Sequence, residues 1–295
     1  MNIIKVLDIE QFRQEDQNHD FYANTFIDHL EHYHKSISVP HKHNFFVTVL
    51  FTKGSGVHEI DFNAYPIQPG SVFMLNPGQT HHWEFSADTD GYIFLHSQSF
   101  YDLYFSHQSI HNFPFFYSTQ NPPCLYLKDH EIEKTTILFQ NILAEFNSDQ
   151  VLKNQKLCSL TDITYIELTR LYLDEQLPKL VKFNNYSDKL QKLEELIEEH
   201  FITEKSPSQY ADWMNMSPKH LNRITKTLLG KTTSELITER VLLEAKRLLI
   251  HSKNSFTNIA LTLGYDDYSY FSKLFKNKCN ETPSEFSKKY LSHTT

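Results

Sequence analysis

The sequence predicts an α+β protein made of two parts, a small antiparallel β-barrel and a purely helical C-terminal domain. Between about Ser36 and Leu95, short runs rich in Val, Ile, Phe and Tyr are separated by turn sequences, which indicates strands of about four to seven residues. After Asp129 the apolar residues recur at helical spacing instead. A length of 295 residues favours two domains, because single hydrophobic cores rarely grow that large.

The composition excludes several classes of protein. With 40% hydrophobic and 14% aromatic residues, the chain can bury a substantial core. No apolar run approaches the ~18 residues of a membrane-spanning helix, and the first ten residues do not resemble a secretory signal. The three cysteines, Cys124, Cys158 and Cys279, lack the spacing of a metal site and favour a reducing compartment. We therefore expect a cytoplasmic protein without membrane contact.

The charge of the chain is unevenly distributed. A formal net charge of −8 argues, by itself, against a partner as negative as duplex DNA. From Lys205 to Thr295, however, 14 Lys and Arg stand against 8 Asp and Glu, whereas the preceding residues hold 14 against 28. A basic C-terminal part on an acidic body is expected when only one domain meets phosphate.

A helix, turn, helix pattern occurs twice within residues 207–290, at an offset of about 50 residues. Self-similarity at a fixed offset is hard to produce by chance, so the two copies predict two equivalent units. The matching positions, first copy then second, are Ala211 and Ala260, residues 221–224 and 271–274, Lys226 and Lys276, and Gly230 and Asn280.

Each copy predicts a short helix, a turn and a second helix. Ser217 and Asp267 are expected to cap the second helices, and Gly230 and Asn280 suit the left-handed conformation that closes them. Ser234 is expected to begin a linking helix of about 17 residues, which spans ~25 Å at ~1.5 Å per residue. The two second helices can then enter two successive major grooves of DNA, about one turn apart.

The exposed sides of the two second helices carry groups that recognise DNA. Arg223 can pair with guanine, Asn222 with adenine, and Tyr268 can contact a thymine methyl group. The lysines suit phosphate better. Any one of these residues could instead belong to an ordinary solvated face. The predicted DNA-binding residues are Ser217, Lys219, His220, Asn222, Arg223, Lys226, Asp267, Tyr268, Ser269, Ser272, Lys273 and Lys276.

These residues resemble the AraC/XylS family of bacterial transcription regulators. The resemblance covers about a hundred residues, although Asn280 stands where the family usually has glycine. It implies two helix-turn-helix units joined by a long helix, a homodimer, contact with RNA polymerase, and activation more often than repression. The residues that carry it are Arg240, Ala245, Ile259, Ala260, Gly264, Tyr265, residues 270–276 and residues 282–286.

Two histidine-containing segments of the predicted barrel resemble the two halves of the cupin motif. They are residues 41–43 and 77–81, and the regulatory domain of AraC-like proteins has this same barrel. His41, His43 and His81 could hold zinc or iron, as in a metallocupin enzyme, but Val47 occupies the position of the usual glutamate ligand. We assign no metal, no cofactor and no enzymatic activity, and keep the metallocupin as an alternative.

A barrel of this size can hold one small ligand. Alternation along the strands places Phe45, Val47, Phe85 and Phe94 among the inward-facing residues, which could equally just fill the core. The alternative is a constitutive DNA-binding dimer without a ligand. The predicted ligand-binding residues are His41, His43, Phe45, Phe51, Phe73, His81, Trp83 and Tyr92.

The predicted organisation is a cupin-like regulatory, ligand-sensing and dimerisation domain (1–176), a linker (177–186) and a DNA-binding domain (187–295). Within the first domain, residues 11–20 are expected to form an irregular arm. Two helices, near 129–146 and 155–176, are expected to follow the barrel. One of their faces could pack on the barrel and leave the other for a partner subunit, or both could pack on the barrel. The acidic helix that begins at Ser187, with Glu198, is expected to lie away from DNA.

Overall fold

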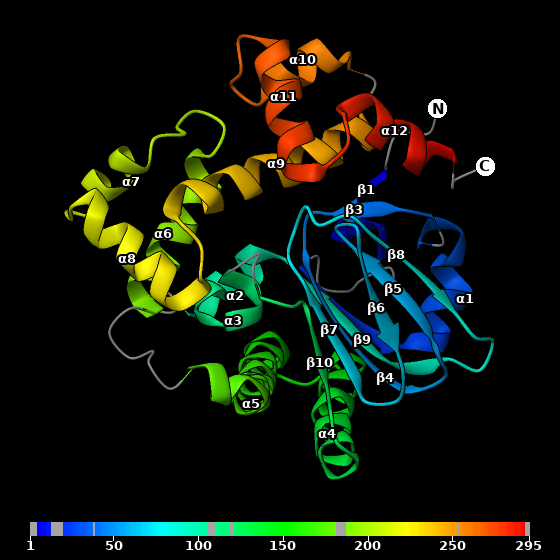
Figure 1. Ribbon diagram of the computed structural model, residues 1–295. Helices are drawn as coiled ribbons and strands as arrows, with labels where there is room; N and C mark the ends of the chain where they lie inside the picture. Colours follow the sequence, from blue (N-terminus) through cyan, green and yellow to red (C-terminus); the bar gives the residue numbers. More distant parts are fainter. Residues whose placement is uncertain are drawn as a thin grey trace. The chain divides into compact units, whose positions relative to one another are not determined.

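A computed structural model of the chain shows a mixed α+β protein, as the sequence predicts (Figure 1). The described residues form two compact units, a β-rich unit before residue 181 and a helical unit after residue 186. Among the described helices, none combines the length and apolarity that a bilayer crossing requires. The residues described are 5–12, 20–37, 39–105, 110–117, 121–180, 187–252 and 254–292.

The β-rich unit contains two five-stranded sheets, whose facing side chains form the barrel interior. The strands pair in antiparallel fashion except for β1 and β3, which are parallel. Sheet A runs in the order β1 (Lys5–Leu7), β3 (His41–His43), β8 (His81–Phe85), β5 (Gly56–Ile60) and β6 (Asn63–Ile67). Sheet B runs in the order β10 (Cys124–Tyr126), β7 (Ser71–Leu75), β4 (Phe46–Lys53), β9 (Asp90–His96) and β2 (Phe21–Thr25).

The register of sheet B decides which residues face the interior. Val49 pairs with both Phe73 and Ile93, and these three share the inner face. Thr48 pairs with Phe94 on the outer face, which α4 (Asp129–Phe146) and α5 (Lys153–Leu180) cover. The expectation that Phe94 points inward was therefore wrong. Both faces of this sheet are buried, so its strands lack the alternation that would reveal the inner face.

The described residues among the first 40 are more ordered than the sequence indicated. They contain a 3₁₀ turn, η1 (Ile9–Phe12), the strand β2 and the helix α1 (Phe26–Ile37). Phe26 packs inside the barrel, with its ring centroid 4.8 Å from that of Phe51 and 5.4 Å from that of Trp83. Most of the expected arm, residues 13–19, lies outside the described residues. Three further short elements are α2 (Gln98–Tyr104), η2 (Ile110–Asn112) and α3 (Pro114–Tyr117).

The helical unit contains the two predicted helix-turn-helix units, joined by α9. Ser217 and Asp267 cap the second helices, and Gly230 and Asn280 close them with φ of 70° and 60°. Residues 177–180 of the expected linker belong to α5, and 181–186 lie outside the described residues. The helices are α6 (Ser187–His200), α7 (Pro207–Trp213), α8 (Pro218–Leu229), α9 (Thr233–His251), α10 (Phe256–Thr262), α11 (Tyr268–Cys279) and α12 (Pro283–Ser292).

The joining helix α9 begins two residues earlier than expected, because its cap is Thr232 and not Ser234. The Thr232 hydroxyl accepts a hydrogen bond from the Glu235 backbone N–H at 3.1 Å, and the Glu235 carboxylate accepts one from the Thr232 backbone N–H at 2.8 Å. This reciprocal capping box satisfies two donors at the start of the helix. Serine is a residue type that often caps helices, which is why the sequence favours Ser234. The position of the cap is decided by Glu235, which lies three residues after Thr232 and completes the capping box.

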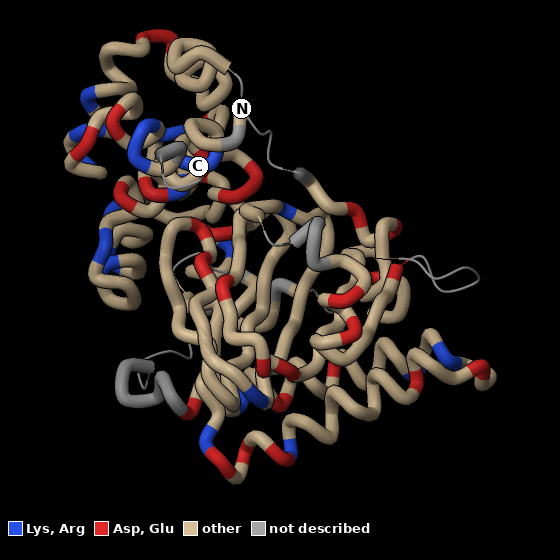
Figure 2. Tube along the Cα trace, turned by 90° about the vertical axis from the view of Figure 1, so that its right-hand side faces the viewer, with Lys and Arg blue, Asp and Glu red and all other residues tan. Residues whose placement is uncertain are grey.

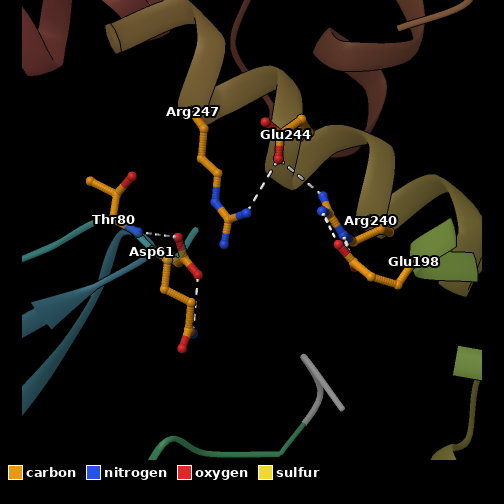
Figure 3. Close-up of polar contacts among 7 residues, drawn as sticks. Asp61, Thr80, Glu198, Arg240, Glu244 and Arg247 are labelled. Atoms are coloured by element: carbon orange, nitrogen blue, oxygen red, sulfur yellow. Dashed lines mark hydrogen bonds and ion pairs between the residues drawn. The ribbon is translucent and has the colours of Figure 1, made fainter. Parts of the chain in front are cut away.

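An ion pair holds α6 against α9. Arg240 is 8% exposed and donates from Nε and Nη2 to the two carboxylate oxygens of Glu198, at 2.6 and 2.7 Å (Figure 3). Its guanidinium also lies 3.9 Å from the centroid of the Phe201 ring and reaches Glu244 at 3.2 Å. Bidentate geometry of this kind is the strong form of an arginine–carboxylate contact. Glu198 is therefore a packing residue of α6 as well as part of its acidic face.

Candidate functional site

The second helix of the first unit, α8, presents a row of three cations. Leu221 and Ile224 are fully buried, while Lys219, Arg223 and Lys226 are exposed on the opposite side. Their spacing of four and three residues puts the three side chains on one stripe. α8 contains no carboxylate, and Figure 2 shows that Lys and Arg (blue) gather on the helical unit, whereas Asp and Glu (red) dominate the β-rich unit. The stripe has the charge that DNA phosphates require.

The second helix of the second unit, α11, has a similar but weaker stripe. Its buried side is formed by Phe271 and Phe275, and Ser269, Lys273 and Lys276 are exposed on the other side. The predicted contacts Tyr268 and Ser272 are half-buried beside this stripe. Tyr270, which was not predicted, is 61% exposed and lies next to Lys273 on the helix surface. The three-residue spacing between the two would have identified it.

Three of the predicted DNA-binding residues have local contacts of their own, and a fourth is half-buried. Asn222 Oδ1 accepts a hydrogen bond from the Thr233 backbone N–H at 3.2 Å, which ties α8 to the start of α9. A paired contact with adenine uses both Oδ1 and Nδ2, so Oδ1 would have to accept a second hydrogen bond with its other lone pair. The Ser217 hydroxyl and the Asp267 carboxylate accept from backbone N–H groups as caps, and His220 is half-buried.

The barrel interior brings together four histidines. The rings of His41, His43 and His58 have centroids 4.3, 5.0 and 5.2 Å from that of His81. All four side chains are at most 2% exposed. His58 was not predicted, although its alternation with Ile60 along β5 places both on the inner face.

Hydrogen bonds define what these rings offer. His43 Nδ1 donates to Phe45 O at 2.6 Å, so its Nε2 is an acceptor. His58 Nε2 and His81 Nδ1 are 2.9 Å apart; whichever donates, the pair leaves one N–H donor and one acceptor on its remaining nitrogens. Trp83 Nε1 is a donor only. Within the described residues, no protein group pairs with His43 Nε2, His58 Nδ1, His81 Nε2 or Trp83 Nε1. We name these four side chains the interior cluster.

The interior cluster carries no charge. Burial lowers the pKa of His43 to about 3 and the pKa values of His58 and His81 well below the ordinary value of 6.5, and the neighbouring histidines add to the effect. Among the described residues, no three His, Cys, Asp or Glu side chains are grouped so that they could hold a metal ion. What the cluster can do chemically is donate and accept hydrogen bonds with an uncharged polar group.

The other predicted ligand residues divide between two faces. Phe45 stacks on His43 at 4.8 Å between centroids, and Phe51 and Phe73 pack against Trp83 and His58 respectively. Tyr92 does not join them. It pairs with Leu50 on the outer face of sheet B, and its hydroxyl accepts from Gln140 of α4 at 2.9 Å. Its side chain therefore lies on the face of sheet B opposite the interior cluster, as that of Phe94 does.

Known protein families match both units. Residues 26–157 match the AraC-like ligand binding domain, and residues 210–289 match a helix-turn-helix domain, which together make up well over half of the chain. The chain belongs to the AraC family of transcription regulators. As an AraC-family protein it is a DNA-binding transcription regulator with a ligand-binding type of domain in front of its helix-turn-helix units.

The AraC-family relatives include the transcriptional activator RhaS. The chain is 23% identical over 254 residues to RhaS of Shigella dysenteriae and 24% identical over 247 residues to RhaS of Escherichia fergusonii, covering 83% of this chain and 86% of each relative. Among solved structures, ToxT of Vibrio cholerae is 15% identical, with a TM-score of 0.44, over 91% of this chain and 98% of ToxT. The C-terminal domain of the response regulator AraT of Geobacillus stearothermophilus is 27% identical, with a TM-score of 0.34, over 36% of this chain and 88% of that domain.

Proposed function

We propose that the protein activates transcription by binding two successive major grooves of promoter DNA and that an uncharged small molecule in the barrel controls this activity. The proposal of DNA binding rests on one observation, that α8 and α11 each present a basic stripe opposite their buried side. Arg223 is the only arginine on either helix, so it is the proposed reader of guanine, and the lysines hold phosphates.

Two substitutions test this division of roles. Binding sites are first selected from random DNA with the full chain. Arg223→Ala should lower affinity for the selected site about tenfold or more and relax the preference at one base pair. Lys276→Ala should lower affinity evenly for selected and mismatched sites and reduce its salt dependence. Lys231→Ala, which removes a cation paired with Glu239 at 2.9 Å, is the matched control. Identical effects of the first two variants would contradict the proposal.

The interior cluster supports the proposed effector chemistry. It offers a fixed acceptor on His43, a fixed donor on Trp83 and a donor and acceptor on the His58–His81 pair, with no cation to balance a carboxylate. Calorimetry with the full chain should therefore detect binding among neutral hydroxyl-bearing metabolites and not among their carboxylate analogues. Preferential binding of the acids would contradict the proposed class of effector, and DNA footprints that never respond to any extract would favour a constitutive DNA-binding dimer.

We further propose that the protein has no enzymatic activity. A metallocupin typically uses a ligand set that includes a carboxylate, and Val47 stands in that position on the inner face of sheet B. Two of the interior nitrogens, on His58 and His81, are engaged with each other. Metal analysis of the purified protein tests this, since stoichiometric iron or zinc that depends on His81 would favour the enzyme.

A homodimer that contacts RNA polymerase completes the proposed function. α5 buries Tyr165, Leu168 and Tyr172 on one side and exposes Ile163, Ile166 and Leu173, by 37 to 47%, on the other. Exposed apolar residues at this spacing suit a second copy of the helix. Ile166→Glu should shift the protein to monomers in light scattering, whereas Ile137→Glu on α4 should not. Transcription in vitro with purified polymerase tests activation.

A further inference from the structure

The two helix-turn-helix units meet at a second place besides α9. The loop of residues 201–206, which joins α6 to α7, belongs to the first unit, because the Tyr210 hydroxyl of α7 donates to Glu204 O at 3.1 Å. Lys205 Nζ donates to Ile202 O across this loop and lies 5.3 Å from the centroid of the Tyr265 ring. Tyr265 belongs to the turn between α10 and α11, in the second unit.

The backbones of the two units touch beside this ring. Gly264 has a φ of +78°, and a Cβ atom added to it would lie 2.2 Å from Ile202 O and 3.0 Å from Lys205 Nζ. A distance of 2.2 Å is far below any van der Waals contact, so a residue with a side chain cannot occupy this position while the loop stays in place. Glycine is favoured here by the left-handed conformation and is required by the closeness of the opposite carbonyl.

The contact continues into the second recognition helix. The Tyr265 ring centroid lies 5.5 Å from that of Phe271, in the buried side of α11, and 6.0 Å from that of Tyr270. Burial lowers the pKa of Lys205 and raises the pKa of Tyr265 to about 12. A partly desolvated ammonium over an aromatic ring is more favourable than the same pair in water. Lys205, Gly264 and Tyr265 therefore connect the first unit with α11.

We propose that this connection, which we name the 205–265 brace, sets the spacing at which the two recognition helices meet their half-sites. Both units pack against α9, and a second connection between them further limits how far they can bend and twist relative to each other. One base pair of added spacing moves a half-site by about 3.4 Å and rotates it by about 35° around the duplex. Lys205 and Gly264 are then specificity residues that do not touch DNA. This proposal depends on the two-groove binding proposed above.

The test uses the full chain and duplexes that carry the two selected half-sites at their selected spacing, or at one base pair more or less. The wild type should prefer its selected spacing by about tenfold or more, because one half-site loses its base contacts otherwise. Lys205→Ala and Gly264→Ala should reduce this preference several-fold while keeping the sequence of each half-site. Lys192→Ala, a change of the same charge on α6 where Lys192 pairs with Glu195, is the control and should behave as the wild type.

The outcomes separate this proposal from the one on which it depends. If random DNA yields no enriched sequence with the wild type, the proposed DNA binding itself fails. If it yields two half-sites and Lys205→Ala keeps the wild-type preference for spacing, the brace does not set spacing. A wild type that enriches a single half-site also overturns the brace, since no spacing is then read. Should Gly264→Ala fail to fold by circular dichroism, Lys205→Ala decides the question.

Discussion

Two groups of buried side chains in the β-rich unit, one around His96 and the other the interior cluster, differ in whether the hydrogen bonds of their histidines are complete. On the outer face of sheet B, His96 Nδ1 donates to Ser97 O at 2.9 Å, and His96 Nε2 accepts from the Tyr165 hydroxyl at 2.7 Å. That hydroxyl in turn lies 3.2 Å from the Thr48 hydroxyl, which can donate to it. In the interior cluster, by contrast, four nitrogens have no partner among the described residues.

The difference shows that a buried histidine indicates binding only when its hydrogen bonds are incomplete. Both groups are fully buried and neutral, so neither burial nor pKa separates them. A completed network joins β4 and β9 to α5 and stabilises the fold. A buried polar atom without a partner costs about 1–3 kcal/mol, which is a reason to expect the interior cluster to be completed by a bound molecule.

Acid should have the largest effect on stability, and it should act on both groups and also on His29 of α1. Burial lowers the pKa of His29 and His43 to about 3 and that of His96 to about 4, from 6.5. Below pH 6.5 the unfolded chain takes up protons that the folded chain does not, so stability falls as pH falls towards the folded pKa values. At ~1.4 kcal/mol per pH unit for each histidine, the three lose about 4 kcal/mol by pH 5.5. Urea unfolding at pH 7.5, 6.5 and 5.5 measures this; an unchanged midpoint would show that these rings are not buried as neutral groups.

Breaking the completed network should have the next largest effect. Tyr165→Phe keeps the ring but leaves His96 Nε2 without its donor, so the free energy of unfolding should fall by about 1–3 kcal/mol. Tyr126→Phe, whose hydroxyl makes an exposed bond to Pro66 O at 3.2 Å, is the control and should change stability by less. Equal losses in the two variants would remove the distinction between the two groups of histidines.

Replacing the hydrogen-bonded pair His58 and His81 should change the free energy of unfolding little. In the double variant His58→Leu and His81→Leu, both partners of one hydrogen bond become apolar groups of similar size, which is close to neutral, within about 1 kcal/mol. Effector-dependent DNA binding should nevertheless be lost. A loss of stability as large as that of Tyr165→Phe would show that the interior pair is also structural.

Removing the N–H donor of Trp83 should have the smallest effect on stability. Trp83→Phe retains the aromatic packing against His58, at 4.6 Å between centroids in the wild type, and deletes Nε1. Stability should stay within a few tenths of a kcal/mol, since the deleted atom has no described partner. Effector affinity, measured by calorimetry, should fall about tenfold, the value of one lost hydrogen bond. An unchanged affinity would place Trp83 outside the ligand site.

Much of the candidate site could be predicted, and the errors share one cause. His41, His43 and His81 were found because turn sequences and motif halves mark them. His58 was missed, and Tyr92 was placed on the wrong face. A strand that is buried on both sides is apolar throughout, so its sequence shows where the strand is without showing which side faces the ligand.

The sequence alone determined the features that depend on neighbours a few residues apart. These are the repeated helix-turn-helix units, the caps at Ser217 and Asp267, and the left-handed closures at Gly230 and Asn280. Such features are local because backbone conformation and first-turn hydrogen bonds involve adjacent residues.

Only the tertiary structure decided the contacts between distant residues. The Arg240–Glu198 pair spans 42 positions along the chain, and the Gly264 contact with Ile202 O spans 62. The same holds for the hydrogen bond between His58 and His81, which lie 23 positions apart. The physical reason is that such contacts depend on how packed elements are oriented, and many sequences with the same local pattern would orient them differently.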